Sequence, residues 1–118
     1  GRPLIDRQHV QLAIAEMQAE TAAIRALVWQ FSRRRVPEQA KASIAKFHAS
    51  DRAQVVIERA LGLLGEHGLR HDAGLERVFR DNRLVRIFEG TNQINRLAVI
   101  EDQQDLLLAA IGGGPPMT

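Results

Sequence analysis

The chain contains no cysteine, which excludes a disulfide framework and thiolate chemistry. Tyrosine is also absent, and the aromatic residues are four phenylalanines and one tryptophan, so aliphatic side chains must form most of the core. The four prolines lie near the two ends and at Pro37, a distribution that suits long helices. No apolar run approaches the ~20 residues of a membrane-spanning helix, and no signal peptide is recognisable.

A large charge of one sign is lacking too, because 16 basic and 14 acidic residues give a formal net charge of +2. The one basic run is Arg33-Arg34-Arg35. It can be interpreted as a phosphate or nucleic-acid contact, or as the solvated last turn of a helix, where cations interact favourably with the helix dipole. The second interpretation is favoured because no aromatic residues for base stacking are interleaved. We therefore expect no nucleic-acid partner.

The length of 118 residues suffices for one domain with a hydrophobic core, and the composition is that of an ordinary soluble globular protein. Apolar residues recur at three- and four-residue steps, which predicts an all-helical fold. Short connections between the helices predict an antiparallel four-helix bundle over residues 1–108, followed by a flexible Gly/Pro-rich tail at 109–118. The expected helices run from Asp6, as N-cap, to about Arg34, from Pro37 to Leu64, from Leu75 to about Arg86, and from Thr91 to about Leu108.

No metal site is expected. The four histidines are His9, His48, His67 and His71. The last two are four residues apart, but the intervening Gly68 argues against a continuous helix that would bring them together. The sequence also contains no Walker motif and no Gly-x-Gly-x-x-Gly.

The most informative stretch ends in Ile87-Phe88-Glu89-Gly90-Thr91. Ile87 and Phe88 could hold the Glu89 carboxylate in apolar surroundings, which raise the pKa of a carboxyl group. Gly90 permits the close approach of a ligand, and Thr91 can cap a helix whose free N–H groups favour phosphates. This pattern predicts a base beside a phosphate-bearing ligand. The alternative is that Glu89 is an ordinary surface-loop residue.

The stretch resembles the C-terminal signature of the acyl-CoA dehydrogenases, in which Arg-Asp, a short spacer and Ile-Tyr/Phe-Glu-Gly-Thr follow one another. The version Arg-Ile-Phe-Glu-Gly-Thr-Asn is most similar to the very-long-chain branch. The resemblance covers about residues 1–102, and the order and spacing of its matches make it specific. Its other matches include Gln8, Ala45-Lys46-Phe47, Leu64-Gly65-x-x-Gly68 and Leu75–Asp81.

The resemblance implies that Glu89 is the catalytic base, which removes the pro-R α-proton of an acyl-CoA thioester while a β-hydride passes to N5 of FAD. The product is a trans-2-enoyl-CoA. Because an α-proton is only weakly acidic, the thioester carbonyl must be polarised and the base strengthened by desolvation. The backbone N–H of Glu89 would polarise the carbonyl, so Glu89 and Gly90 are the expected substrate contacts.

The resemblance also implies two groups of FAD contacts. One group aligns with the family's Gly-Thr-x-Gln, and Thr91 can serve as a helix cap as well. The other aligns with residues that reach the FAD of a neighbouring subunit. The members of the first group are Gly90, Thr91, Asn92 and Gln93; those of the second are Arg7, Gln8 and Gly65, together with Gly68 in the same loop as Gly65.

Two positions depart from the family pattern. Gly62 stands where the family often has Gln, and Glu66 stands where it often has a second glycine. A carboxylate near a pyrophosphate is unfavourable unless it points away. The N-terminal helical and middle β-domains of the family are also absent, and the chain begins with Gly1 rather than Met. We therefore expect a piece of a longer protein that is not active alone.

Three hypotheses follow. The first is the C-terminal domain of an FAD-dependent acyl-CoA dehydrogenase, and the second is a non-catalytic helical bundle that oligomerises or binds a partner. The third is an acyl-CoA oxidase or related monooxygenase. Family analogy implies a homodimer or homotetramer and an electron-transferring flavoprotein as acceptor. It also implies a location in the cytoplasm for a bacterial protein or in the mitochondrial matrix for a eukaryotic one.

Overall fold

The computed structural model describes residues 1–33 and 39–112, except for the side chains of 105 and 106. No strand occurs among these residues, so the all-helical class expected from the sequence is confirmed. The long helices are α1 (Gln8–Ser32), α2 (Gln39–Leu64), α3 (Leu75–Val85) and α4 (Asn92–Ala110), and short 3-10 turns cover Leu4–Asp6, Gly65–Leu69 and His71–Ala73.

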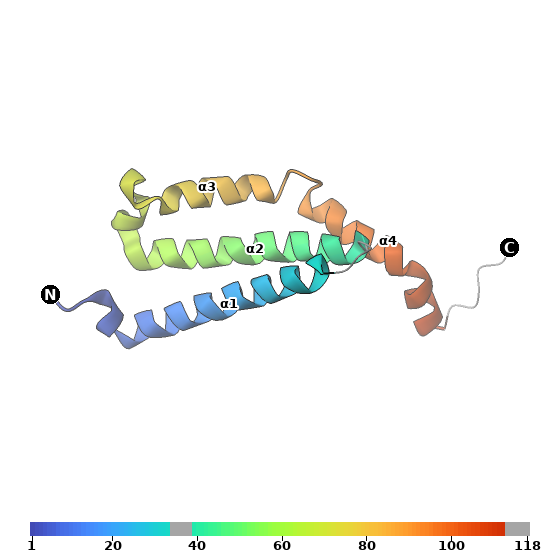
Figure 1. Ribbon diagram of the computed structural model, residues 1–118, viewed down its shortest axis with the longest axis horizontal. Helices are drawn as coiled ribbons and strands as arrows, with labels where there is room; N and C mark the ends of the chain where they lie inside the picture. Colours follow the sequence, from blue (N-terminus) through green and yellow to red (C-terminus); the bar gives the residue numbers. More distant parts are fainter. Residues whose placement is uncertain (34–38, 113–118) are drawn as a thin grey trace.

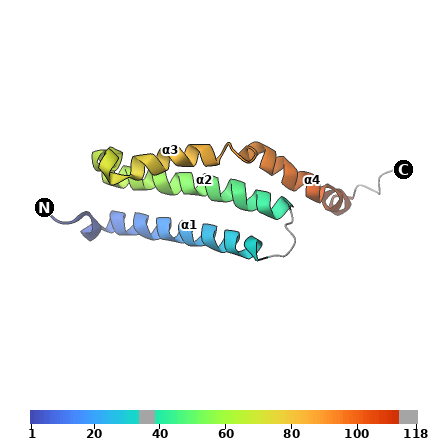
Figure 2. The same ribbon diagram turned by 45° about the horizontal axis from the view of Figure 1, so that its top comes forward.

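Helix α2 is central, and the other three helices pack on it (Figure 1). Helix α1 runs antiparallel to α2 along one side, whereas α3 and α4 follow one another along the other side and also run antiparallel to α2 (Figures 1 and 2). Within the described residues α1 contacts neither α3 nor α4. The antiparallel arrangement is therefore open, with one face of α1 and one face of α4 uncovered.

Most helix ends lie where the apolar periodicity predicted them, but the start of α1 does not. Asp6 is not its N-cap, because the chain first forms a 3-10 turn in which Asp6 N–H donates to the Pro3 carbonyl at 3.1 Å. Arg7 precedes the helix instead and makes no side-chain capping hydrogen bond. Pro37, as the expected first residue of α2, lies outside the described residues. So do residues 113–118 of the expected tail, whose first two residues belong to α4.

The interface between the helices is unusually polar. Among the described residues, only Val10, Ala40 and Ile57 are buried hydrophobic residues. The buried polar residues are Ser43, Ser50, Gln54, Asn82 and Asn92. Because buried polar groups are costly unless they are hydrogen-bonded, their partners define how α3 and α4 sit on α2.

Among the residues described, two ion pairs join α1 to α2. Arg52 donates two hydrogen bonds to the Glu20 carboxylate, which lower the pKa of Glu20, and Arg59 pairs with Glu16 one turn of α1 away. Such exposed pairs contribute at most about 1 kcal/mol each.

No helix in the described part of the chain is both long and apolar enough to cross a membrane.

Candidate functional site

Glu89 lies at the tip of the loop that joins α3 to α4. The loop is compact: the Phe88 N–H donates to the Leu84 carbonyl at 3.0 Å, and the Asn92 N–H donates to the Arg86 carbonyl at 3.2 Å. At the tip, Glu89 has a φ of +56° and Gly90 a φ of +85°. Two successive residues in the left-handed region are easy for glycine but cost a glutamate on the order of 1 kcal/mol. The surrounding contacts must therefore hold this backbone in place.

The carbonyl of Gly90 is the point at which the loop is tied down. Lys46 of α2 donates to this oxygen at 2.6 Å, and the Asn95 side chain of α4 donates to it at 2.9 Å. The same Lys46 ammonium donates to Asn92 Oδ1 at 2.8 Å. Burial lowers the pKa of Lys46, although the charge of Asp51 opposes this shift. Lys46 thus links the residue after Glu89 to the central helix.

The Asn92 side chain is directed into the protein. It is 2% exposed, and its amide donates to Ser50 Oγ at 2.8 Å and to Asp51 Oδ1 at 2.9 Å. Since its oxygen accepts from Lys46, all its main hydrogen-bonding groups are used internally. The expected cofactor contact of Asn92 stays a prediction, and within this chain the polar atoms of its side chain are bonded to α2. Its side chain positions the start of α4.

Asp51 sits at the centre of the charged contacts beneath the loop. The Arg86 Nε lies 2.8 Å from Asp51 Oδ1, in an ion pair without hydrogen-bond geometry. Arg96 donates to the other oxygen and lies over the Phe47 ring at 4.7 Å. Burial raises the pKa of Asp51, but the hydrogen bonds from Arg96 and Asn92, together with the nearby arginine charges, outweigh burial, so the net pKa lies below its ordinary value. The charge of Arg86 acts in the same direction.

The immediate surroundings of the Glu89 side chain are open. Glu89 is exposed, and the side chains of Ile87 and Phe88 are 61% and 54% exposed. The expectation that these two residues bury the carboxylate is therefore wrong within this chain, because both project outward from the loop. Among the described residues, the N–H groups of Glu89 and Gly90 donate no hydrogen bond, so both can bind a ligand.

A hollow of about 210 Å³ lies beside the loop, at the start of α4. Thr91 caps this helix through a hydrogen bond that its Oγ1 accepts from the Ile94 N–H at 3.3 Å, as the sequence predicted. A helix start with nearby arginines suits a phosphate group. The hollow is lined by Arg83, Arg86, Ile87, Thr91, Asn92 and Gln93.

The second group of expected cofactor contacts lies at the other end of α2. Arg7, Gln8 and Gly65 are all exposed there, and the 3-10 turn after α2 begins with Gly65 at a φ of +55°. Because α2 rises about 1.5 Å per residue, roughly 22 Å separate Gly65 from Ser50, which lies beneath the Glu89 loop. The structure therefore does not bring the two groups together.

Gly68 has a packing role at the end of α2. It is buried, and a Cβ at this position would lie 3.1 Å from the Leu64 Cβ and 3.2 Å from the Leu61 Cδ2. The neighbouring Glu66 is exposed in the same turn. Among the described residues, no group of three or more histidines or carboxylates is arranged to hold a metal ion.

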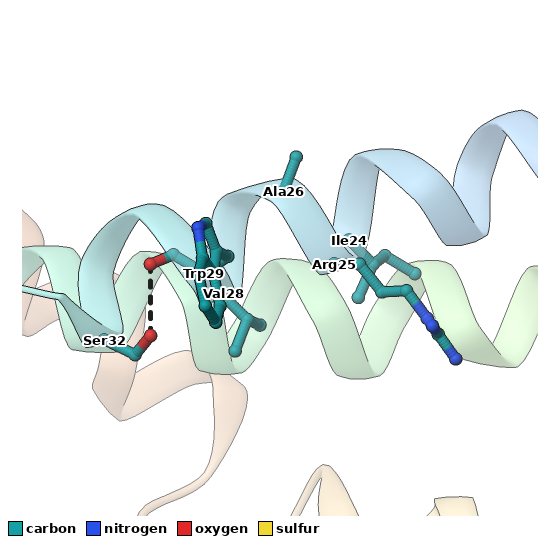
Figure 3. A pocket seen from close by; sticks show the side chains of 6 residues that line it. All are labelled: Ile24, Arg25, Ala26, Val28, Trp29 and Ser32. Atoms are coloured by element: carbon teal, nitrogen blue, oxygen red, sulfur yellow. Dashed lines mark hydrogen bonds between the residues drawn. The ribbon is translucent and has the colours of Figure 1, made fainter.

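A larger hollow of about 640 Å³ runs along α1 alone (Figure 3). It is an open surface rather than an enclosed pocket, since every lining residue comes from one helix. Trp29 is 64% exposed there, and the Arg33 guanidinium lies 5.2 Å from the centre of its ring. Arg33 at the end of α1 thus contacts an aromatic ring; Arg34 and Arg35 lie outside the described residues. The lining residues are Ile24, Arg25, Ala26, Val28, Trp29 and Ser32.

The sequence matches the family model described as "Acyl-CoA dehydrogenase, C-terminal domain" over residues 1–103. Cyclohexane-1-carbonyl-CoA dehydrogenase from Geobacter metallireducens is 36% identical over 107 residues, which cover 86% of this chain and 28% of that protein. Acryloyl-CoA reductase (NADH) from Anaerotignum propionicum is 34% identical over 106 residues, covering 86% of this chain and 27% of the relative.

The mitochondrial short-chain specific acyl-CoA dehydrogenase from Bos taurus is 33% identical over 102 residues, covering 84% of this chain and 25% of the relative. The chain thus spans 25–28% of the length of these relatives. The names of the three do not confirm the narrower resemblance to the very-long-chain branch.

Proposed function

The chain belongs to the acyl-CoA dehydrogenase family, as its C-terminal domain, and we propose that, within a longer protein, Glu89 is the base that removes the α-proton of an acyl-CoA thioester. The observation that carries this proposal is the backbone of Glu89, which keeps a φ of +56° at the tip of an exposed loop. Strained backbone of this kind is concentrated at functional sites. An ordinary surface glutamate has no need of it.

The geometry of the loop suits both tasks that the reaction requires. The unpaired N–H of Glu89 can donate a hydrogen bond to the thioester carbonyl and so stabilise the negative charge that develops there. The carboxylate of the same residue then takes the proton from the adjacent α-carbon. Ile87 and Phe88 are exposed beside it and do not bury the carboxylate within this chain. The desolvation of the base would come from parts of the protein outside this chain.

FAD is the proposed cofactor, and when bound it supplies the acceptor for the β-hydride. The residues at the start of α4 fit part of such a group, because Thr91, Asn92 and Gln93 line the hollow directly after Gly90, and Arg83 adds a positive charge to its lining. A hollow of about 210 Å³ is too small to enclose a dinucleotide. Other parts of the protein would complete the site.

The second group, Arg7, Gln8 and Gly65, would then serve a different FAD. Its distance of roughly 22 Å along α2 from the Glu89 loop agrees with a contribution to the cofactor of a neighbouring subunit. We accordingly propose a homodimer or homotetramer. The exposed apolar side chains on α1 and α4 support this assembly, since large exposed apolar patches mark interaction surfaces.

The proposed substrate class is an acyl-CoA thioester. The relatives' names include cyclohexane-1-carbonyl-CoA, acryloyl-CoA and short-chain acyl-CoA, so the acyl group is left to experiment. The proposed electron acceptor is an electron-transferring flavoprotein, as for a dehydrogenase rather than an oxidase. The proposed location is the bacterial cytoplasm, or the mitochondrial matrix in a eukaryote.

The test is anaerobic reduction of the flavin in the full-length protein that contains this chain. Butyryl-CoA, cyclohexane-1-carbonyl-CoA and palmitoyl-CoA are added in turn while the visible flavin band is recorded. We expect at least one of them to bleach the wild-type flavin and none to bleach the Glu89→Gln variant, whose FAD content should be unchanged. Glu101→Gln, on the exposed side of α4, is the matched control and should behave as wild type.

Reduction of the Glu89→Gln flavin at the wild-type rate would contradict the role of Glu89. A colourless protein that stays colourless with added FAD would favour the non-catalytic helical bundle. Reoxidation by air at the rate of turnover would favour an oxidase.

A further inference from the structure

We propose that Lys46 is a positioning residue for the base, because it holds the carbonyl of Gly90 and thereby fixes the left-handed backbone of Glu89. This inference rests on the proposed function of Glu89. It concerns a side chain from the middle of the sequence that contacts neither substrate nor flavin in the site as proposed.

The contact is short and comes from a different helix. The Lys46 ammonium lies 2.6 Å from the oxygen of Gly90, the residue directly after Glu89. Of the two side chains that donate to this oxygen, Asn95 belongs to α4 and would move with the loop. Lys46 belongs to α2, so it ties the peptide beside the base to the central helix of the domain.

The second contact of Lys46 fixes the direction of the first. Its ammonium also donates to Asn92 Oδ1 at 2.8 Å, and Asn92 is itself held by Ser50 and Asp51. An ammonium between two fixed acceptors cannot move far without losing a hydrogen bond. The carbonyl of Gly90 therefore meets a donor in one defined place, and rotation of the backbone at the loop tip would break this contact.

This restraint matters because the loop tip stores conformational strain. With φ values of +56° and +85°, Glu89 and Gly90 adopt a backbone from which the glutamate would relax if released. Relaxation would displace the carboxylate and the N–H of Glu89 together. A displacement of about 1 Å at a reacting group can cost roughly 100-fold in rate. Loss of Lys46 should therefore affect the chemical step more than substrate binding.

The experiment compares three variants of the full-length flavoprotein. Lys46→Met keeps the length of the side chain and removes its donors, whereas Lys46→Arg keeps a cation that can donate to two oxygens. Arg59→Met is the matched control, since Arg59 is a cation of the same helix that pairs with Glu16 away from the loop. The substrate is the acyl-CoA of the panel that reduces the wild-type flavin fastest. If all three reduce it at the same rate, butyryl-CoA is used.

For Lys46→Met we expect the rate constant of flavin reduction at saturating substrate to fall about 10- to 100-fold, with KM changed less than about 3-fold and FAD content unchanged. Lys46→Arg should recover most of this rate. Arg59→Met should stay within about 2-fold of wild type. In Lys46→Met, hydrogen exchange should accelerate in peptides that span residues 84–93, the loop and the helix ends beside it, and should stay unchanged in peptides from residues 50–64 of α2.

The proposal is overturned if Lys46→Met and Arg59→Met reduce the rate equally, or if Lys46→Arg is no faster than Lys46→Met. Should Lys46→Met not fold, Lys46→Gln keeps a polar side chain that is too short and uncharged to replace the ammonium, and it should lower the same rate constant about 3- to 10-fold without changing KM; an unchanged rate would again overturn the proposal. If Glu89→Gln is reduced as fast as wild type, the proposed function fails instead, and the two failures are thereby distinguished.

Discussion

The side-chain amide of Asn92 donates to Ser50 Oγ at 2.8 Å, which joins the first residue of α4 to the middle of α2. One turn further along α2, Gln54 accepts a hydrogen bond from the Asn82 amide of α3 at 2.9 Å. These two buried asparagines stand on either side of the loop that carries Glu89. The loop is therefore held at both ends by amides inserted against one helix, and its backbone geometry depends on that helix.

Replacing Asn92 by alanine should destabilise the protein by about 1–3 kcal/mol, because the Lys46 ammonium and the Asp51 carboxylate would each lose a partly buried partner. Denaturant unfolding of the full-length protein measures this loss. Gln103→Ala is the control, since Gln103 lies further along α4, is exposed and has no proposed role in the site; its effect should stay within about 0.5 kcal/mol. Equal costs for the two variants would mean that the amide network contributes little.

Two glycine-to-alanine variants should shift stability in opposite directions. Gly90 has a φ of +85°, and a Cβ there would lie 3.2 Å from the Asn95 Nδ2. Gly90→Ala should therefore cost about 1–3 kcal/mol from backbone strain. Gly62 lies inside α2 with no atom within 4 Å of the added Cβ, so Gly62→Ala should stabilise by up to about 1 kcal/mol. Thermal unfolding of both variants against wild type checks this, and a stabilised Gly90→Ala would contradict the restraint at the loop.

The periodicity of apolar residues was sufficient to predict four helices. The buried residues of α2 are Ala40, Ser43, Ser50, Gln54 and Ile57, and their spacing places them on one face of the helix. Thr91 was predictable as a helix cap because capping depends only on neighbouring residues. The prediction of Asp6 as a helix cap was wrong, because its N–H takes part in a 3-10 turn and α1 begins later in the chain.

The polar network beneath Glu89 could not be predicted in the same way. Lys46 and Gly90 are 44 residues apart, and no local pattern indicates that their atoms meet. The left-handed φ of Glu89 is also invisible to periodicity, although the adjacent glycine and the position between two helices were signals of an irregular turn. The apolar pair Ile87-Phe88 misled the prediction, because hydrophobicity does not specify which part of a protein covers a side chain.

Asp51 should make stability depend on acid pH. Its pKa is lowered in the folded state from an ordinary value of 3.8, so the ionised form stabilises the fold above that value and the stabilisation is lost as the pH falls through the folded pKa. Asp51→Asn should cost about 1–3 kcal/mol at pH 7, since Arg86 and Arg96 lose their charged partner. The difference from wild type should be constant down to about pH 5 and shrink below pH 4.

Urea unfolding between pH 7 and pH 3 measures that difference. Asp81→Asn is the control, because Asp81 is exposed and lies 3.6 Å from Arg77 on the surface of α3. It should have little effect at any pH. A difference between wild type and Asp51→Asn that stays constant to pH 3 would show that the Asp51 charge is not what stabilises the loop.

The exposed face of α1 should be covered in the assembled protein. Trp29 is 64% exposed and Val28 45% exposed, beside the open hollow along this helix (Figure 3). If this face joins two subunits, Trp29→Glu buries a charge in the interface and should weaken association at least 30-fold, the equivalent of about 2 kcal/mol for a central tryptophan. Light scattering after size exclusion would then report a smaller mass.

Gln30→Glu adds the same charge at a neighbouring exposed position and should leave the mass unchanged. If Trp29→Glu instead lowers the unfolding temperature without changing the mass, another domain of the same polypeptide covers α1, and the subunit interface must lie on another face, such as the exposed apolar residues of α4.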